Sequence, residues 1–334
     1  MYQRNSHCRM TGAAIALTGL VLAAQDTTSR ALPPFQMPDT VAIRDVDIYS
    51  EGTRMYGQLY SDKSRAGQRL PTIVMAQGWG GTAASLQREG VAFAQAGYLA
   101  LAFDYRGWGR SDSRVVLTAK RAPAEKQNYR FTAEVQEVRE VVDPIEMVID
   151  WQNAISWVAS EPQCDVKRIG VWGTSLSGGL VVSAAVRDSR VKAVHSQVPA
   201  FDGRWTMINP TETNNTWTEA TKRAHGEVGY PAPRANTVGG LIGAPIRYEF
   251  ASWTPVEEIA RIPNCAIQII LAEKDEVVDN KSNGLRAYEL ATGPKNLVTI
   301  PEIKHYGIYR DPDARFRSRD LAIAWFDKYV KAVK

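Results

Sequence analysis

The distribution of apolar positions predicts a chain in which strands alternate with helices. Residues 41–49 alternate apolar and polar side chains, as a half-exposed strand does, and a second strand is predicted at 54–60 after the Glu51-Gly52-Thr53 turn. We expect these two to form an antiparallel hairpin at a sheet edge. Unbroken apolar runs are typical of strands buried on both faces, and they follow at 72–76, 98–103, 168–172, 191–198, 266–271 and 296–300.

Helical periodicity fills most of the intervals between these strands. It covers 86–96, 131–160, 180–186, 281–292 and 313–331, while 112–130 is typical of a loop. Asp143-Pro144 interrupts the segment 131–160, which predicts two helices or one broken helix. Strands that alternate with helices indicate a mostly parallel eight-stranded sheet with helices on both faces. Ligands bind such sheets beyond the carboxyl ends of the strands.

The segment that organises this pattern is Gly173-Thr174-Ser175-Leu176-Ser177-Gly178-Gly179. A strand pattern precedes it and an apolar helix pattern follows it, which favours a nucleophile elbow with Ser175 at its apex. The helix N-terminus would offer unpaired N–H groups to a developing oxyanion. Ser177 is the weaker nucleophile candidate, and a glycine-rich loop without chemistry is the alternative.

A serine nucleophile needs a base and a carboxylate that orients the base. Of the four histidines, His7 lies in the N-terminal segment, His195 within a strand and His225 in an irregular region. His305 follows the last predicted strand, so its imidazole is the one expected to reach Ser175. The acid is expected just after the strand at 266–271, where the candidates are Glu273, Asp275, Glu276 and Asp279.

The oxyanion of an acyl-transfer intermediate needs two donors. The backbone N–H of Leu176 is one candidate, because this residue follows the nucleophile. The other is expected from Gln77-Gly78-Trp79-Gly80-Gly81, where small residues allow close approach, and we choose the N–H of Trp79. A phosphate-binding loop is disfavoured, since no Gly-Lys-Ser/Thr follows.

Taken together, these motifs resemble an α/β hydrolase of the dienelactone-hydrolase-like, acyl-esterase type. The resemblance is carried by Gln77–Gly81, by Asp104-Tyr105-Arg106-Gly107-Trp108-Gly109, by the elbow, and by Asp275 and His305. It favours Asp275 over the other carboxylates and implies a Ser175, His305, Asp275 triad. Dienelactone hydrolases use a cysteine nucleophile, so Ser175 argues against that particular reaction.

The resemblance further implies that residues 201–262 form a cap after the sixth strand, within a single domain at 25–334. Its aromatic-rich composition suggests an apolar substrate pocket, for which the candidates are Trp205, Met207, Trp217 and Trp253. The alternative is that these side chains anchor the cap to the core. Asp104 and Arg106 are expected to brace their turn rather than contact substrate.

Composition and charge narrow the possible partners. The 334 residues are 44% hydrophobic and 23% charged, with a formal net charge of +4. No basic stripe with interleaved aromatics points to nucleic acid. No cysteine or histidine spacing resembles a zinc or haem site, and we expect no metal or cofactor. Cys164 and Cys265 precede different strands, so both are expected to be free buried thiols.

The first 24 residues resemble an export signal. Arg4 and Arg9 form a basic region, and residues 11–24 are apolar and too short for a confident membrane span. Cleavage after Ala23 or Ala24 would give a secreted or periplasmic protein, while an uncleaved anchor or a disordered tail is the alternative. The sequence thus predicts an exported serine hydrolase of small-molecule carboxylic esters. A peptidase or amidase on the same triad and a catalytically silent binding module remain open.

Overall fold

The computed structural model describes residues 31–120, 130–233, 237–238 and 241–332. Its centre is an eight-stranded sheet in the order β1-β2-β4-β3-β8-β9-β13-β14. These strands are Val41–Ser50 (β1), Thr53–Asp62 (β2), Leu70–Ala76 (β3), Leu99–Phe103 (β4), Cys164–Thr174 (β8), Val191–Gln197 (β9), Ala266–Ala272 (β13) and Lys295–Ile300 (β14). β1 and β2 form an antiparallel hairpin at one edge, β2 pairs antiparallel with β4, and the other pairings are parallel. The predicted sheet and edge hairpin are therefore confirmed.

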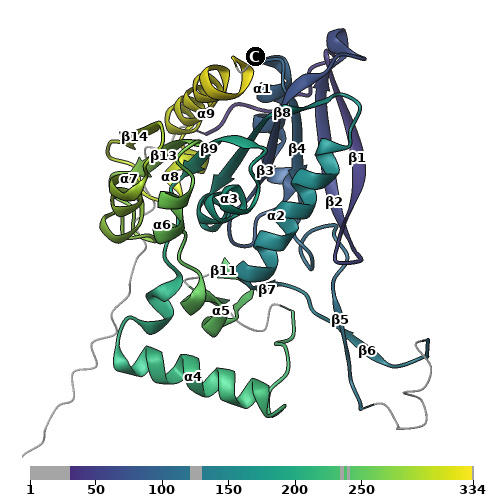
Figure 1. Cartoon of the computed structure of the whole chain (residues 1–334), viewed down its shortest axis with the longest axis vertical. Coiled ribbons are helices and arrows are strands. Elements are labelled where there is room, and N and C mark those ends of the chain that lie inside the picture. The colour runs from purple at the N-terminus through teal and green to yellow at the C-terminus, as the bar shows by residue number, and fades with distance from the viewer. Residues whose placement is uncertain (1–30, 121–129, 234–236, 239–240, 333–334) are drawn as a thin grey trace, which may run out of the picture.

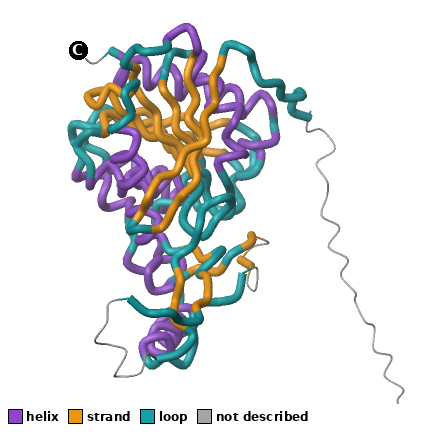
Figure 2. The backbone as a smooth tube through the Cα atoms, turned by 90° about the vertical axis from the view of Figure 1, so that its right-hand side faces the viewer, coloured by secondary structure: helices purple, strands orange, loops and turns teal. Residues whose placement is uncertain are grey.

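Helices cover both faces of the sheet (Figures 1 and 2). α2 (Pro144–Ala159) and α3 (Leu176–Arg187) pack on one face, and α1 (Gln87–Gln95) and α9 (Pro312–Phe326) on the other. Two apolar cores result, one on each side of the strands. On β8, a Cβ on Gly170 would lie 2.8 Å from the Phe326 ring, so this glycine lets α9 pack closely.

Short elements complete the part of the chain outside the insertion. They are the 3₁₀ helices η1 (Lys63–Arg65) and η2 (Ala83–Leu86), the antiparallel strands β5 (Val115–Leu117) and β6 (Val135–Glu137), strand β7 (Val141–Val142), helices α7 (Arg286–Leu290) and α8 (Gly307–Arg310), and the π-helical turns η6 (Lys281–Leu285) and η7 (Asp327–Lys331). Within the ranges that the structure describes, no helix is both long enough and apolar enough to cross a membrane.

The helical prediction for 131–160 is half right. α2 begins at Pro144, with the Asp143 carboxylate accepting hydrogen bonds from the N–H groups of Ile145 and Glu146. Residues 131–143 form no helix and instead hold β6 and β7. β7 pairs in parallel with β12 (Ala244–Pro245), a segment about a hundred residues later in the sequence. The hydrophobic periodicity of residues 131–143 carries no information about a partner so distant in the sequence.

The insertion between β9 and β13 is mainly helical. It contains the 3₁₀ helix η4 (Gly203–Met207), α4 (Pro210–Ala224), the paired strands β10 (Thr237–Val238) and β11 (Leu241–Ile242), β12, α5 (Arg247–Ser252), α6 (Pro255–Glu258) and the 3₁₀ helix η5 (Ile259–Arg261). β9 is the sixth strand of the sheet in chain order. α4 lies apart from the sheet, at the lower end of the molecule in Figure 1.

The turn after β4 is fixed by buried ion pairs and hydrogen bonds. Asp104 accepts hydrogen bonds from the N–H groups of Ala83 and Arg110. The guanidinium of Arg106 pairs with Asp150, whose burial raises its pKa to about 6. These residues brace the turn and do not line the cavity described below.

Candidate active site

Ser175 occupies a sharp turn between β8 and α3. Its backbone is in the left-handed region, with φ 55° and ψ −124°, and its N–H donates to the carbonyl oxygen of Gln197 at 2.8 Å. The turn is so tight that a Cβ on Gly173 would lie 2.2 Å from the carbonyl oxygen of Ser177. Small residues are therefore required around Ser175, and its strained backbone is the kind found at functional sites.

The structure brings His305 and Asp275 to the Ser175 hydroxyl. His305 Nε2 lies 3.1 Å from Ser175 Oγ, and His305 Nδ1 lies 2.8 Å from Asp275 Oδ2. The His305 and Asp275 side chains expose 2% and 0% of their surface. Ser175 follows the central strand β8, Asp275 follows β13 and His305 follows β14, so the carboxyl ends of three parallel strands hold the three groups.

The hydrogen bonds of Asp275 orient the imidazole. Asp275 Oδ1 accepts from the N–H groups of Val277 and Val278, at 2.9 and 2.8 Å, which leaves Oδ2 to accept from His305. A carboxylate cannot donate, so Nδ1 carries the proton. Nε2 is then the unprotonated nitrogen, which can accept a hydrogen bond from the Ser175 hydroxyl.

The competing carboxylates have other partners. Glu276 Oε2 accepts from the backbone N–H of His305 at 2.9 Å and so fixes the loop rather than the ring. Glu273 accepts from the backbone N–H of Glu302, and Asp279 accepts from Ser282. Of the four carboxylates considered from the sequence, Asp275 is the one that contacts the imidazole.

A buried polar network lies behind the elbow. The Tyr309 hydroxyl is 2.7 Å from Thr174 Oγ1, which also accepts from Gln197 Nε2 at 3.1 Å. The Tyr309 ring packs edge-on against the His305 imidazole, with 6.2 Å between ring centroids. Burial raises the pKa of Tyr309, so its hydroxyl keeps its proton. This network supports both Ser175 and His305 from the side of the sheet.

The loop after β3 passes directly against the elbow. A Cβ on Gly78 would lie 2.7 Å from Ser175 Cβ and 3.2 Å from the backbone nitrogen of Leu176. Trp79 and Leu176 both line the cavity that contains Ser175. Neither backbone N–H has a protein acceptor among the described residues. Both are thus free to donate to an oxyanion beside Ser175.

Ser175 opens into a cavity of about 800 Å³ with a mostly apolar wall. The apolar side chains are Trp79, Leu176, Ala200, Trp205, Ile208, Leu241, Phe250, Val277 and Val278, and the remaining lining residues are Ser175, Asp202, Arg204, Glu276, Asp279, Ser282, Asn283 and Tyr306. Arg204 is neutralised by ion pairs with Asp202 and Glu257. The Trp79 ring stacks on Phe250 at 5.7 Å between ring centroids and its indole N–H donates to the carbonyl oxygen of Ile242 at 3.0 Å, which ties the loop after β3 to the insertion.

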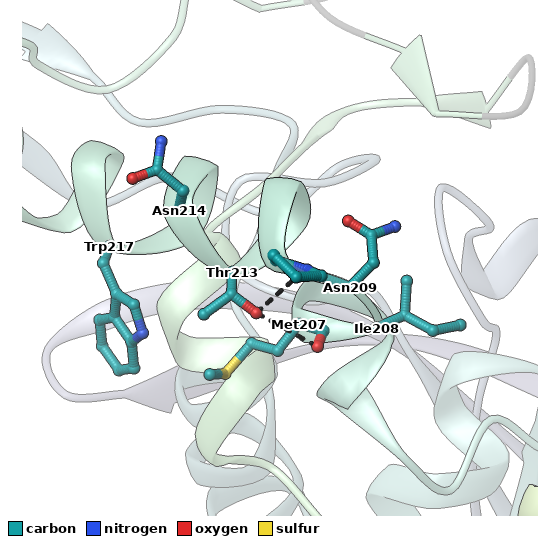
Figure 3. Close-up of a pocket in the computed structure, with 7 residues that line it drawn as sticks. Met207, Ile208, Asn209, Thr213, Asn214 and Trp217 are labelled. Carbon is teal, nitrogen blue, oxygen red and sulfur yellow. Dashed lines mark hydrogen bonds between the residues drawn. The ribbon is translucent and has the colours of Figure 1, made fainter.

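The four aromatic and methionine candidates are not brought together. Trp205 lines the cavity, but Met207 and Trp217 line a separate surface hollow (Figure 3). Trp253 is 3% exposed and belongs to the core. It packs over Gly179 on α3 and donates to Ser183 Oγ at 3.2 Å. The pocket-lining prediction is thus corrected for Met207, Trp217 and Trp253.

Sequence reasoning missed seven apolar or aromatic cavity residues, namely Ala200, Ile208, Leu241, Phe250, Val277, Val278 and Tyr306. The last three could have been found, because they adjoin the predicted acid and base in the sequence. Leu241 and Phe250 reach the cavity through the folding of the insertion, which leaves no local signal. Within the described ranges, no group of three or more His, Cys, Asp or Glu side chains is placed to hold a metal ion.

Comparison with protein families adds to this geometry. The acetyl xylan esterase family model matches residues 37–222, and the prolyl oligopeptidase family model matches residues 145–333. Each match covers more than half of the chain, and together they span the whole sheet. The chain belongs to the α/β hydrolases of the acyl-esterase type.

Individual α/β hydrolases and related proteins agree with this assignment. An uncharacterized 31.7 kDa protein from the traX-finO intergenic region of Escherichia coli is 28% identical over 268 residues, which is 72% of this chain and 84% of that protein. The hypothetical protein PA2218 of Pseudomonas aeruginosa superposes with a TM-score of 0.70 at 22% identity, covering 88% of this chain and 96% of that one. An acetyl xylan esterase from Paenibacillus sp. R4 superposes with a TM-score of 0.60 at 20% identity, covering 90% and 88%. These two structures show that the hydrolase fold extends over nearly the entire chain.

Proposed function

We propose that this α/β hydrolase is a serine hydrolase that cleaves carboxylic esters through an acyl-enzyme. The proposal rests on the chain of hydrogen-bond contacts from Ser175 through His305 to Asp275. Ser175 Oγ lies 3.1 Å from His305 Nε2, and His305 Nδ1 lies 2.8 Å from Asp275 Oδ2. At the Ser175 end, this chain opens into a mostly apolar cavity that is large enough for a small-molecule substrate. The acetyl xylan esterase family model supports an ester as the scissile group.

The reaction follows from the positions of these groups. Ser175 Oγ attacks the acyl carbon while its proton passes to His305 Nε2, and Asp275 stabilises the imidazolium that forms. The backbone N–H groups of Trp79 and Leu176 donate to the oxyanion. The bond to the alcohol oxygen breaks, and His305 returns the proton to the departing alcohol. Water, deprotonated by His305, then attacks the acyl-enzyme and releases the acid and Ser175.

Every step of this mechanism uses groups of the chain itself, so it requires no metal ion or cofactor. Residues 201–262 supply four of the nine apolar lining residues, namely Trp205, Ile208, Leu241 and Phe250. We therefore assign residues 201–262 the role of a cap that shapes the substrate side of the site. The charged residues that line the cavity are Asp202, Arg204, Glu276 and Asp279. Because three of the four are acidic, they favour an uncharged acyl group over an anionic one.

Replacing the nucleophile tests this proposal. Ser175→Ala should lower kcat on 4-nitrophenyl acetate by about 10⁶-fold, because the Ser175 hydroxyl forms the bond to the acyl group. A fluorophosphonate probe should label the wild type at Ser175. Ser177→Ala is the matched control, since Ser177 Oγ contacts the Tyr105 hydroxyl at 2.9 Å and does not line the cavity.

Activity of Ser175→Ala within tenfold of the wild type would reassign the nucleophile. Absence of probe labelling in the folded wild type would favour a catalytically silent binding module instead. Because the prolyl oligopeptidase family model also matches the chain, an amidase is the second candidate. A panel of aminoacyl amides beside the esters separates the two activities.

The predicted export signal, residues 1–24, lies outside the described residues. We propose that the enzyme is exported and acts in a secreted or periplasmic location. N-terminal sequencing of the mature protein should find a first residue just after Ala23 or Ala24. A mature chain that begins at Met1 in the cytoplasmic fraction contradicts export.

A further inference from the structure

The loop that carries one of the two proposed oxyanion donors is rich in glycine. Trp79 follows Gly78 and precedes Gly80, whose φ of 74° is one that favours glycine. The Gly81 N–H closes this turn by donating to the carbonyl oxygen of Gly78 at 3.2 Å. That hydrogen bond does not involve the N–H of Trp79, and the glycines give the backbone around it conformational freedom. Contacts outside the turn therefore help to fix the direction of this N–H.

The Trp79 side chain supplies such contacts, and two of them are made with the insertion. Its indole N–H donates to the carbonyl oxygen of Ile242, in β11, at 3.0 Å. Its ring stacks on Phe250, in α5, with 5.7 Å between ring centroids and 22° between ring planes. Ile242 lies 163 positions after Trp79 in the chain. The position of the loop after β3 therefore depends on a segment that is distant in the sequence.

The same aromatic contacts continue into the wall of the active-site cavity. The Phe250 ring packs edge-on against the Trp205 ring, with 5.5 Å between ring centroids. Trp79, Trp205 and Phe250 all line the cavity that contains Ser175. A substrate group that packs on this aromatic wall would contact the insertion and the loop after β3 at once. The insertion and the proposed oxyanion donor are therefore parts of one packed unit.

We propose that Trp79 is a positioning residue whose side chain holds the loop after β3 against the insertion and thereby directs its own backbone N–H at the oxyanion. This inference rests on the proposed esterase function and gives the insertion a part in the chemical step. The charge that the Trp79 N–H stabilises develops only as Ser175 attacks the acyl carbon, so this contact is strongest in the transition state. A displaced donor therefore lowers kcat and leaves substrate binding nearly unchanged.

Removal of the indole N–H tests this role. Trp79→Phe keeps an aromatic ring against Phe250 but lacks the donor that binds the carbonyl oxygen of Ile242. It should lower kcat on 4-nitrophenyl acetate about tenfold and change KM by less than about twofold. Trp217→Phe is the matched control, because it removes the same group from an indole that is 51% exposed on α4 and lies outside the cavity. This control should keep the wild-type kcat and KM.

A second replacement separates the hydrogen bond from the packing of the ring. Benzothienylalanine, incorporated in place of Trp79, has sulfur where the indole has N–H and keeps the shape of the bicyclic ring. It should reproduce the loss of kcat. Phenylboronic acid forms a tetrahedral adduct with a reactive serine hydroxyl and so resembles the transition state, and its inhibition constant should rise about tenfold in both Trp79 variants. The inhibition constant of Trp217→Phe should equal that of the wild type.

Wild-type kcat and boronic acid affinity in the benzothienylalanine protein would overturn the positioning role. An effect confined to KM would also overturn it, because the indole would then be only a part of the cavity wall. Neither result affects the proposed triad, since the wild type still cleaves the ester. If the wild type neither cleaves 4-nitrophenyl acetate nor binds phenylboronic acid, the proposed esterase function fails, and the role of Trp79 fails with it.

Discussion

At the residue scale, the contacts of a single carboxylate distinguish Asp275 from the acids around it. Asp275 combines two backbone N–H donors on Oδ1 with the imidazole on Oδ2, and its side chain is completely buried. In the proposed mechanism, Asp275 Oδ2 beside Nδ1 holds His305 in the tautomer whose Nε2 accepts the proton of Ser175.

Substitution of this carboxylate should separate its role from that of its neighbours. Asp275→Asn should lower kcat by about 10⁴-fold, because an amide can donate to Nδ1 and so favour the wrong tautomer. Esterase kinetics on 4-nitrophenyl acetate measures the effect. Glu273→Gln is the control, since Glu273 accepts from the Glu302 N–H and lies outside the cavity. Equal losses in both variants would argue against Asp275 as the orienting group.

The residues of the proposed triad could be selected from the sequence for a physical reason. Each follows a buried apolar run, and the carboxyl ends of parallel strands meet at one edge of a sheet. The choice of Asp275 over Glu276 needed the family resemblance, because spacing alone does not tell which side chain turns inward. Trp217 and Trp253 were misplaced because composition reports an aromatic cluster without reporting which surface each ring covers.

At the element scale, the close packing of the first turn of α3 depends on two glycines, Gly178 and Gly179. A Cβ on Gly178 would lie 2.8 Å from Pro199 Cβ, and a Cβ on Gly179 would lie 2.1 Å from the carbonyl oxygen of Ala200. The backbone N–H of Ala200 in turn donates to the carbonyl oxygen of Ser175 at 3.0 Å. α3 and the chain after β9 therefore position the elbow together.

Gly179→Ala tests this close packing. Alanine is intrinsically the better helix former by about 1 kcal/mol. The clash with the backbone of Ala200 should outweigh this gain and destabilise the fold by about 3 kcal/mol, as overpacked substitutions do. Urea unfolding measures the change, and Gly229→Ala, where a Cβ meets no atom within 4 Å, provides the control. A Gly179→Ala protein as stable as the wild type would show that the backbone of Ala200 can move away at little energetic cost.

Residues 131–143 show where element prediction from sequence ends. Their spacing fits a helix, yet Val141 and Val142 pair with Ala244 and Pro245. The β-branched side chains of Val141 and Val142 fit a strand as well as an apolar helix position, so pairing with the distant segment Ala244–Pro245 decides that they form a strand. Six strands of the main sheet were predicted from unbroken apolar runs, and the edge hairpin from the alternation at 41–49 and the turn after it.

At the scale of the whole molecule, both faces of the sheet are apolar cores, and a neutral histidine lies in one of them. His195 Nδ1 is 2.8 Å from Gln268 Oε1, while Nε2 is buried without a hydrogen-bond partner among the described residues. The ring stacks against Trp172 and lies near Phe326. Burial lowers the pKa of His195 to about 4, because the protonated ring would leave Nε2–H without an acceptor.

The depressed pKa predicts acid sensitivity of the fold. In the unfolded chain His195 takes up a proton near pH 6.5, but in the folded chain only near pH 4, so stability falls as pH decreases between these values. The loss from this residue should approach about 3 kcal/mol at pH 4. His195→Gln should flatten the dependence of unfolding free energy on pH, measured with urea. His225→Gln, at an exposed position, should keep the wild-type slope, and the same slope in His195→Gln would contradict the prediction.

The order in which the strands contribute to the site also bears on biosynthesis. A ribosome releases Ser175 long before it releases His305, 130 residues later. During that interval the nascent polypeptide carries a hydroxyl with no general base, so it cannot attack esters around it. Esterase activity should therefore arise only when β14 and the loop after it have emerged from the ribosome and packed against the rest of the sheet. Translation timing itself would delay activity until the protein is almost finished.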